Sequence, residues 1–556
     1  MLILRRKTAG AVLLISLIAL SVWVFRLSSK DSLRERIYGE IFDAIKAAKP
    51  VDPPKDRLAF RLNGCDMQGV GVNRGDQIDR AVFENLDRCY TLTEPYFRGL
   101  QQPHMEFLEF LQESLDFEPE SPVFDHLFPR EEGIITVGGG RFSLLTYSMI
   151  KVLREHNTTL PVEVIIPPQD EGDNDYCNNV LPALNAKCVY FRDVLPKSLL
   201  KDWKFERYQI KAVALLISSF KKVLYIDADN FPLKNLDGIF ESNVFEENGL
   251  VLWPDLWRRM TAPVFYRIAN VEVDFLKRVR SLGDDVSPPS RYSAFAPDEM
   301  YNKKSVPFHD LLGTVPDSAS ESGQLLVDKT RHFQTLLLAL YYNVYGPEWY
   351  YSLFSQGTAG EGDKETFAVA AHVLRRKYYQ VKTKLSFDGY WTKGPSFHGV
   401  ALLQYDCVND YELYQKAKET VKREKKKYSL YDPNYDSELS FYKSLMRPTS
   451  DVPIDVMFAH ASFHKFDPWG LYKEGVYLNE DGTQFRSFLS LQKLNWFDIE
   501  LFNFRLLDQS LCGKSPIDFK YLRDKYNDPE WPRMCKYVKD RVSYLEDSHD
   551  EAIKKP

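Results

Sequence analysis

The sequence predicts an α/β protein with a mainly parallel sheet, and three observations support this prediction. From residue 133 onward, short apolar runs typical of strands alternate with amphipathic helical segments. Hydrophobic residues make up 44% of the 556-residue chain and aromatic residues 14%, which suits a large buried core. The formal net charge of −6 mixes both signs evenly, so nothing indicates a nucleic-acid-binding protein.

The N-terminal segment at residues 8–25 carries no charge. As an α-helix it would be about 27 Å long, enough to cross a thin bilayer. We interpret it as an uncleaved signal anchor, with residues 1–7 in the cytosol, because only a short tail precedes it and the folded part follows. A cleaved signal peptide ending near Ala19 and Ser21 is the alternative. Basic residues flank both ends, so their distribution does not set the orientation.

Residues 26–130 are predicted to form a stem and packing helices. The stretch "DSLRERIYGEIFDAIKAAK" has apolar residues at helical spacing, and it ends where Pro50, Pro53 and Pro54 stop a helix. A plain spacer and a helix that pairs with a partner chain are both compatible with this pattern. Residues 95–117 also look helical, are rich in Phe and Leu, and are expected to pack on the domain that follows.

The expected strands of the α/β part are "GIITV", "VEVIIP", "KCVYF" and "KVLYI". Helices are expected at residues 142–156 and 206–220, where apolar residues form one stripe. The first strand ends in three glycines, Gly138 to Gly140, and the last strand ends in Asp227 and Asp229.

Asp227 and Asp229 stand where ligands of α/β proteins usually bind, beyond the carboxyl end of a strand. Residues i and i+2 of an extended segment point the same way, and two carboxylates aimed at one place attract a divalent cation. Asp173 and Asp175 have the same spacing, but they stand in a polar loop without a strand before them. We interpret that second pair as solvated surface.

Four longer segments carry a family resemblance: "QIKAVALLISSFKKVLYIDADNFPLKN", "GLVLWPDLWRRMTAP", "SESGQLLVDKTRHFQTLLLALYYN" and "SQGTAGEGDKETFAVAAHVL". Together they resemble the fungal Golgi α-mannosyltransferases of mannan outer-chain synthesis (glycosyltransferase family 71). They are most similar to the α-1,2-mannosyltransferases that branch the α-1,6-linked backbone. The resemblance covers roughly residues 132–468, and the stem and the last 45 residues carry none of it.

This resemblance implies an A-type nucleotide-sugar glycosyltransferase fold, a Rossmann-like mixed sheet, with a catalytic domain at residues 131–510 and a C-terminal extension at 511–556. It implies a retaining, metal-dependent transfer of mannose from GDP-mannose to α-mannan outer chains of N-glycans. It also implies a type II Golgi membrane protein with a lumenal catalytic domain. Alternatives are α-1,3 or mannosyl-phosphate transfer on the same fold, or a non-catalytic subunit of a complex with other mannosyltransferases.

The resemblance also suggests roles for single residues. Asp227 and Asp229 would hold Mn²⁺, or Mg²⁺, against the donor diphosphate, with His460 as third ligand and His464 as the alternative. Asp363 and Glu365 would lie near the reacting carbon, whereas Glu361, flanked by glycines, is read as a turn residue. Donor binding is assigned to Lys211, Gly138, Gly139, Glu321, Ser322, Gly323, Gln324 and Lys465.

The segment "LVLWPDLWRRMTAP" is expected to contact donor or acceptor through Asp255 and Trp257, because aromatic rings stack on sugars. Arg258 or Arg259 would meet a phosphate or the acceptor. Core packing of the tryptophans is the competing interpretation.

The seven cysteines show no metal-ligand spacing, which argues against a zinc site. In a lumenal protein Cys177 and Cys188 are a plausible disulfide pair, and the odd count leaves one thiol over. Asn157 begins a single glycosylation sequon, "NTT", which is usable if this part of the chain is lumenal.

Overall fold

The computed structural model describes residues 33–55, 80–88, 90–293, 298–391, 396–461 and 463–554. The predicted membrane segment at 8–25 lies outside these ranges. Within them, no helix combines the length and the apolar character needed to cross a membrane.

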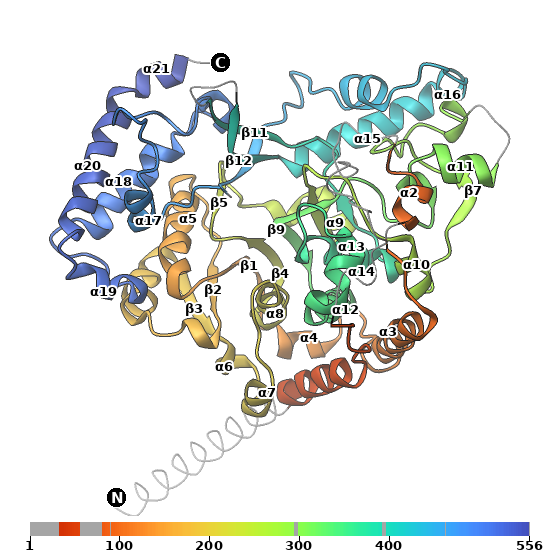
Figure 1. Cartoon of the computed structure of the whole chain (residues 1–556), viewed down its shortest axis with the longest axis horizontal. Helices are drawn as coiled ribbons and strands as arrows, with labels where there is room; N and C mark the ends of the chain where they lie inside the picture. Colours follow the sequence, from red (N-terminus) through yellow and green to blue (C-terminus); the bar gives the residue numbers. More distant parts are fainter. Residues whose placement is uncertain are drawn as a thin grey trace, which may run out of the picture.

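A seven-stranded sheet forms the centre of the molecule (Figure 1), with strand order β10-β6-β9-β4-β1-β2-β3. Its pairs are parallel except where β9 runs antiparallel between β4 and β6, so the predicted mainly parallel sheet is confirmed. The strands are β1 (Arg130–Val137), β2 (Val162–Ile166), β3 (Ala186–Tyr190), β4 (Phe220–Ile226), β6 (Leu250–Pro254), β9 (Ser320–Asp328) and β10 (Tyr379–Gln380).

Successive residues of the central strands face opposite layers of the core, as the pleat of a strand requires. In β4, Val223 and Tyr225 belong to one hydrophobic cluster, and Leu224 and Ile226 belong to the other. Both faces of the sheet are therefore covered, which explains why its strands are almost entirely apolar.

A second sheet of four strands, in the order β11-β12-β13-β5, is linked directly to the first. Its strands are β5 (Asn230–Pro232), β11 (Ser386–Trp391), β12 (Phe397–Tyr405) and β13 (Val456–His460), and a separate pair is formed by β7 (Asp274–Arg278) and β8 (Leu311–Leu312). Only residues 227–229 separate β4 from β5, so the chain crosses from one sheet to the other at the two aspartates.

Helices cover the two faces of the main sheet. Those packed in the first hydrophobic cluster include α3 (Glu94–Ser114), α4 (Pro122–Leu127), α8 (Gln209–Ile217), α10 (Pro263–Ile268), α12 (Phe333–Val344), α13 (Tyr351–Ser355) and α14 (Thr366–Val373). The second cluster includes α5 (Ser143–Glu155), α9 (Asn243–Asn248), α17 (Pro468–Glu474), α18 (Ile499–Leu511), α20 (Trp531–Asp547) and α21 (His549–Lys554). The first cluster also takes in α2 (Phe83–Arg88), α6 (Phe191–Val194) and α7 (Lys197–Asp202), and the second takes in the start of α15 (Cys407–Arg423). Three further helices are α11 (Glu299–Ser305), α16 (Lys425–Tyr428) and α19 (Arg523–Tyr526).

The stem contains a helix at residues 33–47, drawn in red below the sheet in Figure 1, that packs on the first cluster. Its residues Ile37, Ile41, Phe42 and Ile45 are buried, so the predicted apolar face is confirmed. The Tyr38 hydroxyl donates to the carbonyl of Leu216 at the end of α8 (2.9 Å). This face therefore lies against the protein's own core, and the helix is neither a free spacer nor open for a partner along that face.

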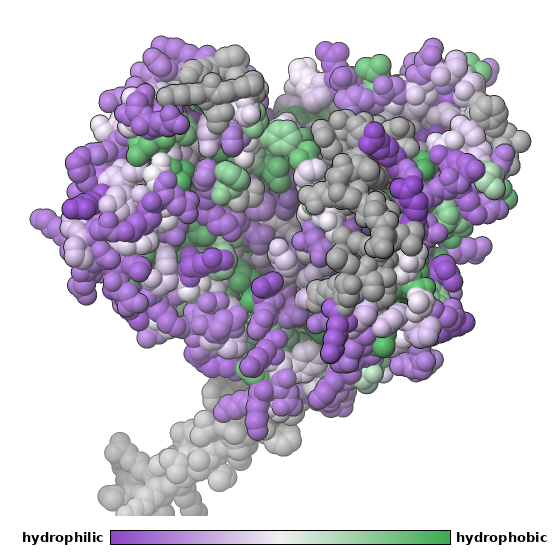
Figure 2. Space-filling model, viewed as in Figure 1, coloured by the Kyte–Doolittle hydropathy of each residue, from purple (hydrophilic) through white to green (hydrophobic). Residues whose placement is uncertain are grey.

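Two disulfides are present among the described residues. Cys177–Cys188 confirms the predicted pair, and Cys512–Cys535 joins the end of α18 to α20 in the C-terminal extension. Cys407 is a buried free thiol. The face drawn in Figure 2 is mostly hydrophilic and is hollowed between the C-terminal helices and the side that carries α15, where several hydrophobic residues line the hollow.

Candidate functional site: a cation cradle where two sheets meet

The two aspartates lie in the turn that connects β4 with β5, at the carboxyl end of β4. The Asp227 amide donates to the carbonyl of Gly323 on β9 (2.8 Å), and the Asn230 amide donates to the carbonyl of Asp227 (3.0 Å). The turn is thus fixed by the neighbouring strand as well as by its own hydrogen bonds. The predicted position beyond a strand end is confirmed.

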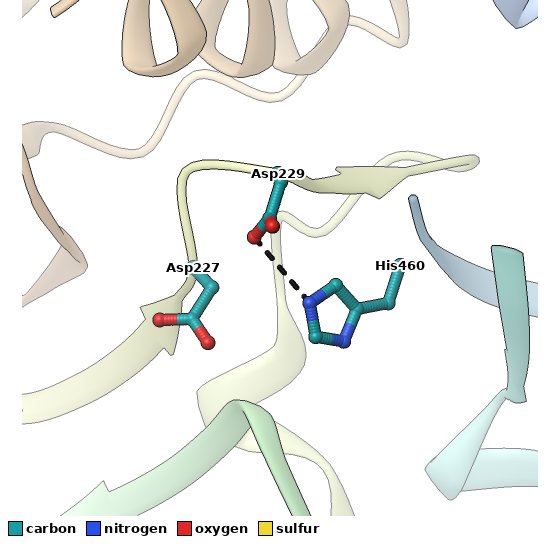
Figure 3. Close-up of side chains that lie close together, drawn as sticks. All are labelled: Asp227, Asp229 and His460. Atoms are coloured by element: carbon teal, nitrogen blue, oxygen red, sulfur yellow. Dashed lines mark ion pairs between the residues drawn. The ribbon is translucent and has the colours of Figure 1, made fainter. Parts of the chain in front are cut away.

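His460 ends β13 and pairs in register with Asn230 on β5, which brings its ring to the aspartates. One ligand atom from each of Asp227, Asp229 and His460 lies within 4.8 Å of those of the other two (Figure 3). We call these three residues the cation cradle. His460 Nε2 is 3.3 Å from Asp229 Oδ1, and Nδ1 is 3.4 Å from Glu321 Oε1. His464 instead packs on Phe463 and Tyr477 and is outside this group. Of the two predicted histidines, the structure therefore brings His460 to the aspartates.

Charge is concentrated around His460. Burial acts to lower the pKa of His460, but Glu321 and Asp229 outweigh it and hold the pKa well above the ordinary value. Burial acts to raise the pKa of Asp229, but His460 and Lys465 outweigh it and keep that pKa below its usual range. Lys465 Nζ is 2.8 Å from Asp229 Oδ2, and its side chain is 42% exposed. An exposed ammonium beside the aspartates is suitably placed to meet an anion there.

The three side chains fit a divalent cation by their chemistry. Two carboxylates and an imidazole are ligands that Mn²⁺ accepts, and Mg²⁺ accepts the carboxylates readily. His460 Nδ1 is buried and has no hydrogen-bond partner of good geometry. Lys211 lies beside Asp227 and Lys465 beside Asp229, and Asp227 also accepts from the Tyr225 hydroxyl (2.5 Å).

Gly323 makes room for the imidazole. A Cβ at this position would lie 2.7 Å from His460 Nδ1 and 3.0 Å from Glu321 Oε1. The family resemblance predicts "ESGQLL" to be a small-residue turn that admits donor sugar. That expectation of a turn is wrong: the segment belongs to strand β9, and the space left by its glycine is filled by His460. Beside it, Gln324 is fully buried and accepts from Asn230 Nδ2 (2.5 Å).

Lys211 lies on α8 and is buried between two carboxylates. Its Nζ is 3.1 Å from Asp227 Oδ2 and 3.1 Å from Asp363 Oδ2, and it donates to the carbonyl of Ser322 (2.7 Å). Burial opposes the charge, but the two aspartates raise the pKa of Lys211 well above its ordinary value. Because the Lys211 ammonium pairs with both aspartates, it holds Asp227 in place. Contact between Lys211 and the donor stays a prediction.

The short turn Asp363–Glu365 contributes three consecutive charges that reach three different parts of the site. Asp363 meets Lys211, Lys364 pairs with Asp255 at the end of β6, and Glu365 pairs with buried Arg259. Glu365 Oε1 also accepts from the Ser320 amide at the start of β9 (2.9 Å). Both Glu365 oxygens have protein partners, so Glu365 fixes the start of β9 against Arg259 and does not face the reacting carbon through a free oxygen.

Asp363 is buried beside Asp227, and burial raises its pKa although Lys211 acts against this. Ser322 Oγ donates to Asp363 Oδ1 (3.3 Å). Asp363 therefore stands close to the cation cradle without being one of its ligands. Glu361 lies exposed between Gly360 and Gly362, both at positive φ, which agrees with a turn residue.

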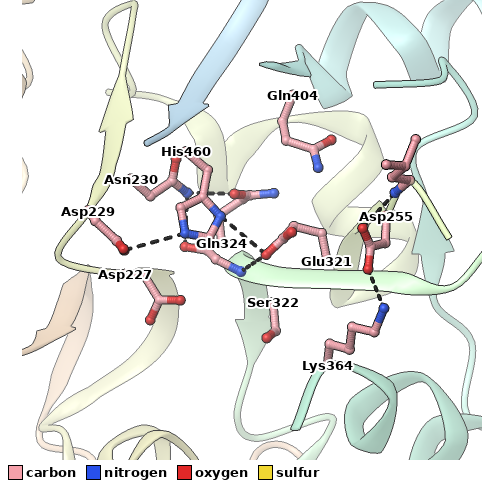
Figure 4. A network of polar contacts seen from close by, with 12 residues as sticks. Asp227, Asp229, Asn230, Asp255, Glu321, Ser322, Gln324, Lys364, Gln404 and His460 are labelled. Carbon is pink, nitrogen blue, oxygen red and sulfur yellow. Dashed lines mark hydrogen bonds and ion pairs between the residues drawn. The ribbon is translucent and has the colours of Figure 1, made fainter. Parts of the chain in front are cut away.

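Asp255, Glu321 and Lys364 extend the polar cluster away from the cradle (Figure 4). Burial raises the pKa of Asp255, and Lys364 lowers it in part. Asp255 and Trp257 line a cavity of about 230 Å³, consistent with a ligand contact. Trp253, by contrast, is fully buried core.

Of the two arginines after Trp257, Arg259 is fully buried and cannot meet a phosphate or the acceptor. Arg258 also lines the cavity of Asp255 and Trp257, so such a contact stays a prediction for it. Arg258 Nε donates to Asp317 Oδ2 (2.6 Å) and its side chain is 6% exposed. Arg259 is fully buried and donates to the carbonyls of Pro316 and Ser318 (both 2.8 Å). Both guanidinium groups therefore serve to fix the segment that leads into β9.

The glycines after β1 lie at the same edge of the parallel sheet as Asp227. A Cβ on Gly138 would lie 2.3 Å from Val164 Cγ1 on β2, and Gly139 has a φ of +90° beside Asp170. Close packing and backbone conformation thus account for both residues. Contact with a donor remains a prediction for them.

The second aspartate pair is not solvated surface. Asp173 is 2% exposed and accepts from Ser143 Oγ (2.7 Å) and from the Lys520 amide (2.5 Å). It joins the start of α5 to the C-terminal extension. This long-range contact cannot be predicted from the polar residues around Asp173. Asp175 accepts from the Asp518 amide (3.2 Å) in the same place.

Sequence reasoning missed Lys364, Asn230 and Gln404 as members of the cluster. Asn230 directly follows the acidic motif, and Lys364 stands between two acids that were singled out. Gln404 on β12 donates to the carbonyl of Pro254 (2.8 Å), and no local signal marks it.

The fold and the site define a mixed α/β protein with a candidate divalent-cation site between its two sheets. A model of the protein family described as "Mannosyltransferase putative" matches residues 131–406. The chain belongs to this family of mannosyltransferases.

Curated relatives span most of the chain. It is 45% identical to a Saccharomyces cerevisiae protein named α-1,2-mannosyltransferase MNN5, over 94% of this chain and 92% of that one. It is 41% identical to S. cerevisiae α-1,2-mannosyltransferase MNN2, over 93% and 85% of the two chains. It is 33% identical to Candida albicans α-1,2-mannosyltransferase MNN2, over 84% and 74%.

Solved structures are similar only at a distance. The glycosyltransferase GlyE of Streptococcus pneumoniae is 12% identical over 45% of each chain, with a TM-score of 0.26. The galactosyltransferase LgtC is 11% identical over 45% of this chain and 73% of that one, with a TM-score of 0.24. Scores this low carry no weight for the fold.

Proposed function

We propose that the protein is a retaining, metal-dependent α-1,2-mannosyltransferase that transfers mannose from GDP-mannose to α-1,6-linked mannan, with an A-type glycosyltransferase fold. The observation that carries the proposal is the convergence of Asp227, Asp229 and His460 at the junction of two sheets in a chain of this family. The names of relatives that span nearly the whole chain support the α-1,2 linkage.

Asp227, Asp229 and His460 would hold the cation, Mn²⁺ or Mg²⁺. When bound, such a cation neutralises charge on the leaving diphosphate. Lys465, exposed and 2.8 Å from Asp229, adds a second positive charge on the side where the diphosphate would lie. Lys211 orients Asp227, because its ammonium is fixed by Asp363 and Ser322 as well.

An α-linked donor and an α-linked product require retention of configuration. Retaining glycosidases use a carboxylate as nucleophile, and the alternative here is attack by the acceptor on the face from which the diphosphate leaves. Asp363 and Glu321 are the carboxylates beside the cradle that are not counted among its ligands. We assign charge stabilisation to Asp363, and we assign Glu365 to bracing β9.

The compartment is also proposed. A Golgi lumenal location, with residues 8–25 as a type II anchor, fits the two disulfides, since disulfides persist in oxidising compartments. Asn157 is exposed and suits glycosylation in that location. Complexes with other mannosyltransferases would then form in the same membrane.

The test is transfer of radiolabelled mannose by the full chain, with GDP-mannose, Mn²⁺ and α-1,6-mannobiose, followed by linkage analysis. The proposal expects an α-1,2-linked product that depends on the cation. An α-1,3-linked or phosphate-linked product would replace the proposed linkage. Absence of transfer by the wild type with every acceptor would favour a non-catalytic subunit.

A further inference from the structure

A second cavity lies outside the group of Asp227, Asp229 and His460. It has a volume of about 420 Å³, within the range of ligand-binding pockets. Its walls come from β10, from α15 and from the loops around residues 283–285 and 316–318. None of the site residues predicted from the sequence lines it.

This cavity adjoins the 230 Å³ cavity that holds Asp255 and Trp257. Gly283, Asp317, Ser318 and Tyr442 line both, so the two are neighbours across one wall. A ligand chain that passes Trp257 would therefore reach the larger cavity next. Gln380 Nε2 fixes this wall by donating to the carbonyls of Ser318 (3.1 Å) and Ala319 (3.2 Å).

Tyr378 contributes its ring to the wall of the larger cavity. Its hydroxyl oxygen has almost no accessible surface and therefore does not face the open volume. Arg280 and Asp285, which act electrostatically on Tyr378, line the same cavity.

Most charged side chains in the cavity wall pair with other groups of the protein. Lys382 Nζ is 2.8 Å from Asp285 Oδ2, and Arg280 NH1 donates to the carbonyl of His309 (2.6 Å). Arg376 donates to Gln334 Oε1 (2.9 Å). Paired charges and tyrosines offer alternating donors and acceptors, which suits a neutral polyhydroxyl ligand better than an anion.

We propose that this cavity binds a mannose unit of the acceptor chain, distinct from the unit that receives the new mannose. The inference rests on the proposed function and deepens it: the enzyme would read acceptor length through a subsite lined by Tyr378, Tyr414 and the Lys382–Asp285 pair.

The first measurement is KM for α-1,6-linked mannobiose, mannotriose and mannotetraose with the full chain at saturating GDP-mannose and Mn²⁺. A subsite beyond Trp257 predicts a KM that falls at least tenfold between the shortest and the longest acceptor, with little change in kcat. Equal KM values for all three would overturn the proposal.

One variant locates the effect. Gln415→Trp fills the cavity from α15 and should abolish the length preference. It should not alter KM for mannobiose or for GDP-mannose.

A matched control exists in the chain. Lys416 neighbours Gln415 on α15 and is exposed, so Lys416→Trp controls for a bulky residue on this helix.

The outcomes separate the two proposals. Lack of transfer to any acceptor counts against the proposed function. Transfer with a length preference that Gln415→Trp leaves unchanged counts against the subsite alone. Inhibition by inorganic phosphate that Gln415→Trp removes, without a length preference, would assign the cavity to an anion and overturn the subsite.

Discussion

Gly323 shows how the absence of a side chain can determine a site. His460 occupies the space where a Cβ would stand, and the same ring lies against Asp229 and Glu321. The third candidate ligand therefore depends on a residue of another strand that itself binds nothing.

Gly323→Ala should weaken Mn²⁺ binding by roughly 10- to 100-fold, because the new methyl displaces the imidazole and altered support of a ligand has effects of this size. Titration calorimetry on the purified full chain would measure it. Gly399→Ala on β12 is the control, since its Cβ would meet nothing closer than 3.9 Å. Unchanged affinity in Gly323→Ala would mean that His460 is not a ligand.

At the scale of elements, the stem helix at residues 33–47 belongs to the folded core. Besides the bond from Tyr38, the Tyr345 hydroxyl donates to the carbonyl of Ile45 (2.7 Å) and the Trp349 indole donates to the carbonyl of Val51 (2.7 Å). Side chains from α12 and the turn after it thus hold the end of the stem.

Ile41→Ala should lower the free energy of unfolding by about 2–5 kcal/mol, because Ile41 is completely buried and truncation leaves a cavity. Urea unfolding followed by circular dichroism would test this. The exposed neighbour Glu40 serves as control, and Glu40→Ala should change stability by less than about 0.5 kcal/mol. A stem that is only a spacer would make both substitutions neutral.

At the scale of the whole molecule, several buried histidines are held neutral. Burial lowers the pKa of His104 and His309 to about 3, and that of His332 and His372 to about 4. The unfolded chain binds protons on these groups near pH 6.5, while the folded chain does not. Their contribution is complete above pH 6.5 and is lost as the pH falls from there toward 4 and 3.

The free energy of unfolding should therefore fall between pH 7.5 and pH 5.5, by about 1.4 kcal/mol for each such histidine. His104→Gln should reduce this loss by that amount, since it removes one of these titrating groups, whose Nε2 lies 2.8 Å from the Tyr342 hydroxyl. Urea unfolding at the two pH values measures both. Equal pH dependence in wild type and variant would contradict the assignment.

The sequence was informative where the signal is local. The strand that ends in Asp227 and Asp229, the helix before it and the apolar face of the stem could all be predicted from periodicity. His460 was found because it follows a short apolar strand, as Asp227 does. The chemical roles of the site residues came from the family resemblance, since residue spacing alone predicts only a cation site at Asp227 and Asp229.

Long-range pairing explains what was missed. Arg259, Glu365 and Lys364 look available in sequence, yet each is committed to a partner more than 100 residues away. Asp173 looks solvated because its polar loop is covered by a segment near the C-terminus. Such contacts depend on which elements meet in the fold, and single-sequence patterns do not encode this.

The central claim is that Asp227, Asp229 and His460 hold a cation that mannose transfer requires. The most direct test is the initial rate of transfer from GDP-mannose to α-1,6-mannobiose, measured against Mn²⁺ concentration for wild type and for His460→Gln. The account predicts a saturable rate in the wild type, abolished by chelation, and a half-saturating Mn²⁺ concentration raised at least tenfold in the variant. Superimposable curves, or full transfer in the presence of chelator, would contradict it.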